Sequence, residues 1–290
     1  MKELDLNVFP KIDRTGWENL AQKQLKGANP LHELSWKNDG GLDLERYYDE
    51  SDLIELTYLS DFFTDLKPHR WKLYQRIASE DIKEANREAL EALMGGCDGI
   101  IFDLTNSNKT DDLLKNIDEQ ICDLSFINNS LDSLPTKSVL FTDSNCIFEK
   151  KPHTSPITQL VELISSLESE TFVHRKAFVD FFLEIASVRA LRYLLNQKSM
   201  EVHIHTQIPK HESEEHQWFL NTTAGLASIL GGSHSIDLTT HIGDSRISRN
   251  TGNLIREESG IKEYTDQCGG SYYIEVLTDK IIKEVVEKLK

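Results

Sequence analysis

Cysteine is scarce in this chain, and the cysteines that are present lie far apart. The 290 residues include four of them, Cys97, Cys122, Cys146 and Cys268. No two form a C-x-x-C pair, which zinc knuckles and redox dithiols both require. We therefore expect four reduced thiols with structural roles.

Long apolar runs are also missing. The sequence has no stretch of about 18 uncharged apolar residues, the length that a membrane-spanning helix needs. Residues 1–5 alternate in charge and lack the apolar core of a secretory signal. We expect a protein that stays in the cytoplasm.

Basic residues are outnumbered by acidic ones. The chain has 32 Lys and Arg against 48 Asp and Glu, which gives a net charge of −16. Surfaces that bind nucleic acid or anionic lipid need clustered positive charge. The composition therefore argues against nucleic-acid and membrane partners.

The middle of the chain repeats a strand followed by a helix. Residues 99–104 are a short apolar run suited to a strand buried on both faces, and they follow a helix that we expect Ser79 to cap and Gly95 to end. Six more strands are predicted near residues 71–76, 121–126, 138–142, 171–174, 202–207 and 235–238, with helices near 156–167, 176–197, 214–230 and 244–258. Between residues 126 and 138 about one strand-helix unit is expected to be missing. The pattern predicts an α/β fold with a parallel sheet, a (β/α)8 TIM-type barrel or a shortened version of it, over residues 66–290.

The first 65 residues have a different character. They form a polar segment with isolated aromatic residues, Trp17, Trp36, Tyr47 and Tyr48. These side chains could fold back on the chain's own barrel, or they could anchor a partner, as aromatic residues often do at interfaces. We predict that residues 1–65 are a partner-binding arm, which truncation up to residue 48 would remove without unfolding the barrel.

One predicted strand carries a row of polar residues. His203, His205 and Gln207 share a face, because side chains alternate along a strand. They could contact a ligand in a barrel lumen, form structural hydrogen bonds or bind a metal as His-x-His. No third ligand with suitable spacing is evident, so we predict no metal site.

Two further motifs could bind phosphate. Arg246, Arg249 and Arg256 could hold a phosphate group, but on a helix such a series is more often solvated or ion-paired. The run at residues 269–271 is rich in glycine, lacks a lysine and predicts a turn.

Several motifs follow one another in an order that resembles a known family. They lie at residues 25–27, 34–37, 41–43, 80–93, 102–104, 181–190, 205–207, 230–233, 246–251, 257–260 and 269–273. Together they resemble the barrel part of methylmalonyl-CoA mutase, and the pattern is similar to the small, non-cobalamin subunit of that family. The resemblance implies a (β/α) barrel and an N-terminal segment that wraps around another subunit.

The sequence departs from this family where the family's chemistry takes place. Catalytic members have Arg-Gln-Tyr-Ala-Gly on the first barrel strand, where this chain has Tyr74, Gln75 and Arg76. A guanidinium cannot replace an aromatic ring beside a radical intermediate. The family's Gly-Tyr-His is best matched by residues 139–145, which have neither the tyrosine nor the histidine. An inward-pointing Arg76 needs a carboxylate partner, and we predict Asp103 on the next strand.

The cobalamin-binding motif of the family, Asp-x-His-x-x-Gly, is also absent. None of the ten histidines has an aspartate two positions before it. The resemblance therefore implies that this chain binds no cofactor and that adenosylcobalamin is held by a partner. That partner is expected to be the mutase large subunit, in a heterodimer.

We predict a small-subunit-like partner of methylmalonyl-CoA mutase, itself without catalytic residues, in a complex that interconverts methylmalonyl-CoA and succinyl-CoA. The candidates for a vestigial or substrate-facing surface are Tyr74, Gln75, Arg76, His203, His205 and Gln207. Two alternatives stay open: the catalytic barrel of a split cobalamin-dependent acyl-CoA mutase, and an independent CoA-binding scaffold barrel.

Overall fold

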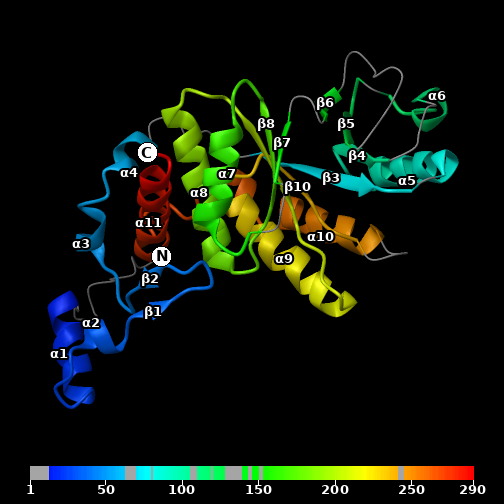
Figure 1. Cartoon of the computed structure of the whole chain (residues 1–290). Helices are drawn as coiled ribbons and strands as arrows, with labels where there is room; N and C mark the ends of the chain where they lie inside the picture. Colours follow the sequence, from blue (N-terminus) through cyan, green and yellow to red (C-terminus); the bar gives the residue numbers. More distant parts are fainter. Residues whose placement is uncertain are drawn as a thin grey trace, which may run out of the picture.

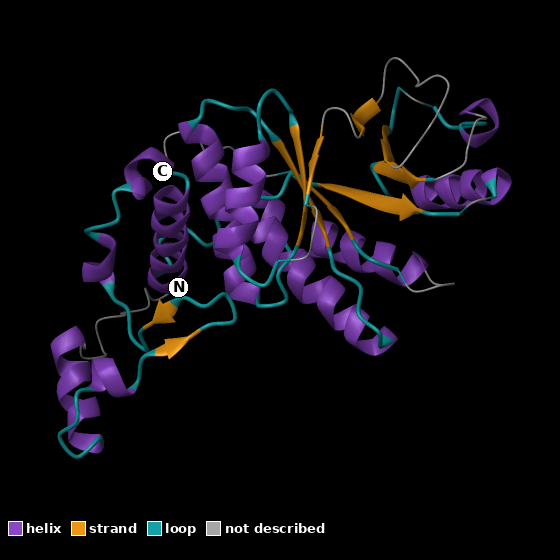
Figure 2. Cartoon of the chain, viewed as in Figure 1, coloured by secondary structure: helices purple, strands orange, loops and turns teal. Residues whose placement is uncertain are grey.

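A computed structural model describes residues 13–62, 70–79, 81–104, 110–118, 120–127, 139–142, 146–149, 153–240 and 245–290. Its centre is one parallel sheet of eight strands (orange in Figure 2). The strands are β3 (Lys72–Ile77), β4 (Gly99–Asp103), β5 (Asp123–Ile127), β6 (Val139–Thr142), β7 (Cys146–Phe148), β8 (Phe172–Lys176), β9 (His203–Gln207) and β10 (Ser235–Asp237). The predicted α/β class with a parallel sheet is confirmed.

The sheet has the strand order of a barrel. Its order is β6-β5-β4-β3-β10-β9-β8-β7, so that the last strand, β10, pairs with the first, β3. Among the described residues no ladder joins β6 to β7, which leaves two four-stranded halves that meet along β3 and β10. The sequence predicted seven strands and a missing unit after residue 126. The count among the described residues is eight because of the additional three-residue strand β7. Residues 128–138 lie outside the described ranges, so the missing unit stays a prediction.

Helices cover the outside of this sheet. They are α5 (Ile82–Met94), α6 (Thr110–Leu113), α7 (Pro156–Ser166), α8 (Phe181–Gln197), α9 (Glu214–Gly231), α10 (Ser245–Glu258), the short 3-10 helix η2 (Ile261–Glu263) and α11 (Tyr272–Lys288). Figure 1 shows α5 and α6 beside β4 and β5, whereas α7, α8 and α9 accompany β7 to β10. None of the helices in these ranges is both long and apolar enough to cross a membrane.

Two predicted helix starts are corrected by the capping residues. Asp81, not Ser79, caps α5, because its side chain accepts hydrogen bonds from Lys83 N and Glu84 N. The helix predicted from residue 176 begins at Phe181, where Asp180 caps the chain by accepting from Leu183 N at 2.7 Å. Lys176 is therefore the last residue of β8 and not part of a helix.

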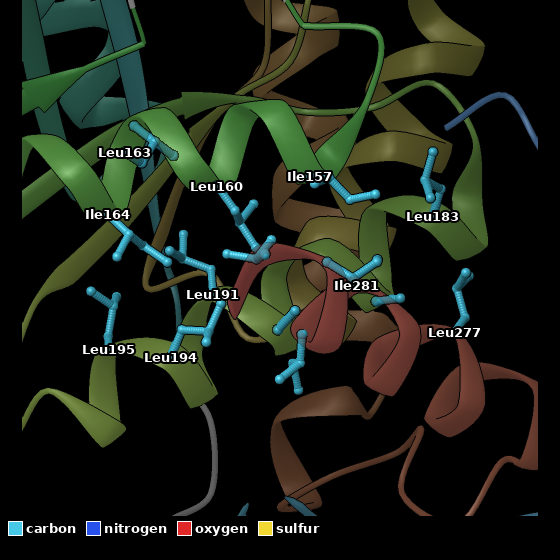
Figure 3. Close-up of a cluster of buried hydrophobic side chains, with 14 of the residues drawn as sticks. Ile157, Leu160, Leu163, Ile164, Leu183, Leu191, Leu194, Leu195, Leu277 and Ile281 are labelled. Carbon is cyan, nitrogen blue, oxygen red and sulfur yellow. The ribbon is translucent and has the colours of Figure 1, made fainter. Parts of the chain in front are cut away.

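A hydrophobic core lies between α7, α8 and α11. Figure 3 shows ten of its aliphatic side chains pointing toward one another, namely Ile157, Leu160, Leu163, Ile164, Leu183, Leu191, Leu194, Leu195, Leu277 and Ile281. A second core packs α5, α9 and α10 against β3, β4 and β5. The two cores together cover both halves of the sheet with helices.

The N-terminal segment only partly resembles a separate arm. Its elements are α1 (Arg14–Gln24), α2 (Pro30–Glu33), the antiparallel pair β1 (Trp36–Lys37) and β2 (Asp43–Leu44), α3 (Glu50–Leu53) and α4 (Tyr58–Phe62). Leu42, Leu44, Leu56 and Tyr58 are buried in the core around α11. In Figure 1, α1 and α2 lie far from the sheet. Truncation up to residue 48 would thus remove core residues, while residues 1–12 and 63–65 lie outside the described ranges.

Replacing Leu191 by Ala should destabilise the protein by about 2–5 kcal/mol, because a fully buried leucine leaves a cavity. Leu254→Ala is the matched control, since Leu254 is 61% exposed and its loss should cost less than about 0.5 kcal/mol. Urea unfolding followed by circular dichroism measures both. Equal midpoints for the two variants would contradict the assigned core.

Candidate functional site

The inner face of β3 points into the lumen of the curled sheet. Leu73 and Ile77 pack outward in the core around α5, so Tyr74 and Arg76 face inward. Aromatic and imidazole rings from other strands fill the same space. The ring of His205 lies 5.6 Å from Tyr74 and 5.1 Å from His174, centroid to centroid.

Arg76 is the centre of a charged cluster that crosses the lumen. Its Nη1 donates to Asp103 Oδ2 on β4, and its Nε donates to Asp237 Oδ2 on β10, both at 3.1 Å. Its Nη2 lies 2.6 Å from His174 Nε2 on β8. The predicted pairing of Arg76 with Asp103 is confirmed, and Asp237 and His174 are partners that the sequence did not reveal. We call these four residues the Arg76 cluster.

The Arg76 cluster fixes the protonation of Asp237 and His174. Burial alone would raise the pKa of Asp237, but Arg76 and His205 stabilise its carboxylate and hold the pKa well below its usual range. Burial and the nearby guanidinium lower the pKa of His174 far below its ordinary value. A neutral His174 can accept the hydrogen bond from Arg76, so the cluster holds one cation and two carboxylates near neutral pH.

Tyr74 lies nearer the amino ends of the strands. Its hydroxyl donates to Asp123 Oδ2 at 2.7 Å, and Asp123 also pairs with Lys72. Burial and the Asp123 carboxylate raise the pKa of Tyr74 well above its usual range. The phenol therefore remains protonated and is tied to the barrel wall.

The polar face predicted for β9 does turn inward. His203 Nε2 and His205 Nδ1 each lie 2.8 Å from Ser235 Oγ on the neighbouring strand β10. Ile204 and Ile208, on the opposite face, are buried in the two helical cores. In the described ranges no three His, Cys, Asp or Glu side chains are grouped so as to hold a metal ion.

Gln75 differs from the other candidates on β3 because it faces away from the lumen. Its Oε1 accepts from Arg249 Nη1 at 2.8 Å, and Arg249 also donates to Ser245 Oγ. Arg256 pairs with Asp98 at 2.6 Å, which favours the ion-paired interpretation for this part of the arginine series. The glycine-rich run is the predicted turn, with Gly270 at φ +80° just before α11.

A cavity of about 1350 Å³ opens above the Arg76 cluster. Arg76, Lys176, Gln207 and Asp237 contribute to its floor, and the loops that follow β3, β8, β9 and β10 form its walls. These are the carboxyl ends of the strands, where barrel enzymes place their active sites. The Arg76 cluster lies directly beneath the cavity and fills the lumen there.

The aromatic residues predicted to bind a partner are all half-buried. Trp17 stacks on Tyr47 with centroids 5.2 Å apart, and Trp36 lies beneath the Arg46 guanidinium at 5.3 Å. Tyr48 packs on Tyr273 of α11 at 5.9 Å. Each of these rings thus packs partly against the chain itself, and its binding to a partner stays a prediction.

Comparison with known proteins agrees with this architecture. A model of the methylmalonyl-CoA mutase family matches residues 166–290. The methylmalonyl-CoA mutase small subunit of Porphyromonas gingivalis is 25% identical over an alignment that covers 98% of this chain and 63% of the relative. The chain is thus similar to the methylmalonyl-CoA mutase family, to its model over residues 166–290 and to its small subunit over nearly the whole chain. Among relatives in that family, the mutase of Escherichia coli is 32% identical over 41% of this chain.

The likeness to full-length mutases is partial. The chain's match spans 21% of the Escherichia coli mutase and 32% of the 2-hydroxyisobutanoyl-CoA mutase large subunit of Aquincola tertiaricarbonis, which is 27% identical over 54% of this chain. Among solved structures, a dihydropteroate synthetase aligns with 74% of this chain and 94% of its own, at a TM-score of 0.40 and 8% identity. That value is too low to add weight to the fold.

The three histidines of the lumen are not placed as a lower ligand to the cobalt of adenosylcobalamin, the cofactor that the family uses. A lower ligand to cobalt requires a histidine nitrogen directed at the metal, which in the family comes from Asp-x-His-x-x-Gly. In the lumen, His174 Nε2 faces Arg76, and His203 and His205 both contact Ser235. We therefore derive no chemistry through this cofactor.

Replacing Arg76 by Met should destabilise the protein by about 3 kcal/mol at pH 7, because it leaves Asp237 buried without its cation. Arg87→Met is the matched control, since Arg87 pairs with Glu84 and Glu91 on the exposed side of α5 and should cost less than about 1 kcal/mol. Chemical unfolding of both variants and the wild type gives the comparison.

The pH dependence of the stability difference between the wild type and Arg76→Met distinguishes a charge effect from a packing effect. In the wild type the pKa of Asp237 is lower in the folded state than in the unfolded state, where it is about 3.9. The ionised Asp237 therefore stabilises the fold above about pH 3.9, and this contribution disappears as the pH falls further. Without Arg76, burial raises the pKa of Asp237, so protonation stabilises the variant. The stability difference should therefore shrink between pH 7 and pH 4. A difference that stays constant would identify lost packing as the cause.

Proposed function

We propose that this chain is a non-catalytic, small-subunit-like partner of a methylmalonyl-CoA mutase. In this proposal a large subunit holds adenosylcobalamin and interconverts methylmalonyl-CoA and succinyl-CoA. The chain contributes a barrel-like domain that stabilises the complex. The alignment over 98% of the chain with a mutase small subunit supports the pairing.

The Arg76 cluster is the observation that supports the non-catalytic role in this proposal. An open lumen is needed for a substrate that reaches a reacting centre inside a barrel. Here Arg76 bonds to three strands across that space, and its side chain is only 20% exposed. Withdrawing it would leave Asp237, which is 3% exposed, without its guanidinium partner.

The first test compares the isolated chain with its complex. The purified chain with excess adenosylcobalamin should form no succinyl-CoA and should retain no cobalamin after gel filtration. Co-expression with a mutase large subunit should yield a stable complex that is active. Turnover by the isolated chain at about 1 per second or more would instead support a split enzyme.

Arg76→Tyr serves as the control for this test. It restores the residue type that the family's catalytic members carry on the first barrel strand, but it removes the guanidinium from Asp103 and Asp237. We expect lower stability and no isomerase activity. Activity in this variant would mean that one substitution separates this chain from a catalyst.

The second test addresses the N-terminal segment. Trp17→Ala should weaken binding to the large subunit at least about tenfold, as expected for an aromatic anchor. Trp17 stacks on Tyr47 and lies on α1, which Figure 1 shows far from the sheet. Leu20→Ala is the matched control, since Leu20 lies on the same helix and is 57% exposed.

Deletion of residues 1–33 extends this test and keeps Leu42 and Leu44, which are buried in the core around α11. Circular dichroism should show an intact fold, and binding should be lost. Unchanged affinity would place the interface elsewhere and leave the aromatic residues as internal packing.

A further inference from the structure

Lys176, Gln207 and Asp237 form one row across three neighbouring strands. Lys176 pairs in register with Gln207, and Gln207 pairs with Asp237. Two positions earlier, His174 and His205 face the lumen, so alternation places Lys176 and Gln207 on the same inner side. Both line the cavity at the carboxyl ends of the strands.

The ammonium group of Lys176 has no ion-pair partner among the described residues. Its backbone N donates to Glu149 Oε2 at 2.6 Å, and its backbone carbonyl accepts from Gln159 Nε2 at 2.9 Å. In the part of the chain that the structure describes, no ion pair or hydrogen bond engages the Lys176 ammonium, and none engages the Gln207 amide. A half-buried ammonium without a counter-ion is unfavourable, so an anion bound beside it would be stabilised.

Asp237 in this row and Glu149, which accepts from the backbone N of Lys176, already have donors. Arg76 holds Asp237. Glu149 accepts from Gln159, from the backbone N of Lys176 and from the backbone N of His153. Lys176 thus offers positive charge to the cavity of a protein whose net charge is −16.

The remaining walls suggest the shape of a ligand. Ala177, Phe178 and Val179 line the cavity after β8, and Pro209 and Leu238 line it after β9 and β10. Glu84, Glu88 and Glu91 of α5 line the cavity together with Arg87, which pairs with Glu84 and Glu91. Asp39 and Asp180 line it too, and the net negative charge of this set disfavours a second anionic group there. The walls therefore suit a ligand with one anionic end and an apolar body.

We propose that this cavity binds a small organic anion. Lys176 Nζ and the Gln207 amide hold its carboxylate or phosphonate-like head group, and its apolar body lies against Phe178, Val179 and Leu238. This site lies above the Arg76 cluster and is independent of the proposed pairing with a large subunit.

Isothermal titration of the full chain at constant ionic strength tests the proposal. Benzoate and phenylphosphonate are the probes, and benzamide is the neutral analogue of the same shape. At least one anion should bind, and benzamide should bind at least about tenfold more weakly, a difference of about 1.4 kcal/mol. The stronger of the two anions identifies the head group as carboxylate or phosphonate.

Two variants locate the binding. Lys176→Gln should weaken anion binding at least about tenfold, whereas Lys288→Gln, at the exposed end of α11, should leave it unchanged. Gln207→Glu places a carboxylate in register beside Lys176 and should also abolish binding. It decides the question if the first variant does not fold.

Three results would overturn the proposal. The first is that neither anion binds the wild type, and the second is that benzamide binds as tightly as benzoate. The third is that the folded Lys176 and Gln207 variants bind the anion with wild-type affinity. Because none of these measurements involves a large subunit, the outcome does not depend on whether the chain pairs with one.

Discussion

The hydrogen bonds of Arg76 are the interaction on which the barrel-like sheet depends. The two halves of the sheet share backbone bonds along β3 and β10, and in the described ranges no ladder closes β6 to β7. Arg76 extends from β3 to Asp103 in one half and to Asp237 and His174 in the other. One side chain therefore adds links across the lumen between two halves whose backbones pair along β3 and β10.

A buried guanidinium stabilises a fold only when nearly all its donors are used. The same condition is met twice more, once between β8 and α8 and once between α8 and α11. Arg175 donates to both carboxylate oxygens of Glu184, at 2.6 and 2.8 Å, with both side chains fully buried. Arg189 does so with Glu275 of α11, at 2.9 and 3.0 Å. These ion pairs fix helix orientation around α8, much as the Arg76 cluster fixes strand positions.

The sequence predicted the strands whose apolar runs are long and missed the features that depend on tertiary contacts. β7 has three residues, too few for a period to be recognised. α11 was missed although Ile274, Leu277, Ile281 and Val285 keep helical spacing. The Asp103 partner followed from its place at the end of the next strand. Asp237 and His174 come from strands far away in sequence, and only the curled sheet brings them to Arg76.

The candidate residues form two groups that differ in their depth in the lumen. Tyr74, His203 and His205 lie deep in the lumen, where each side chain contacts another strand of the sheet. Gln207 lies one step closer to the carboxyl ends, beside Lys176, where the cavity begins. A polar row on one strand can thus be structural at its lower positions and available for a ligand at its upper one. The boundary between these roles is the level of Arg76, because its ion pairs fill the lumen below and leave the space above open.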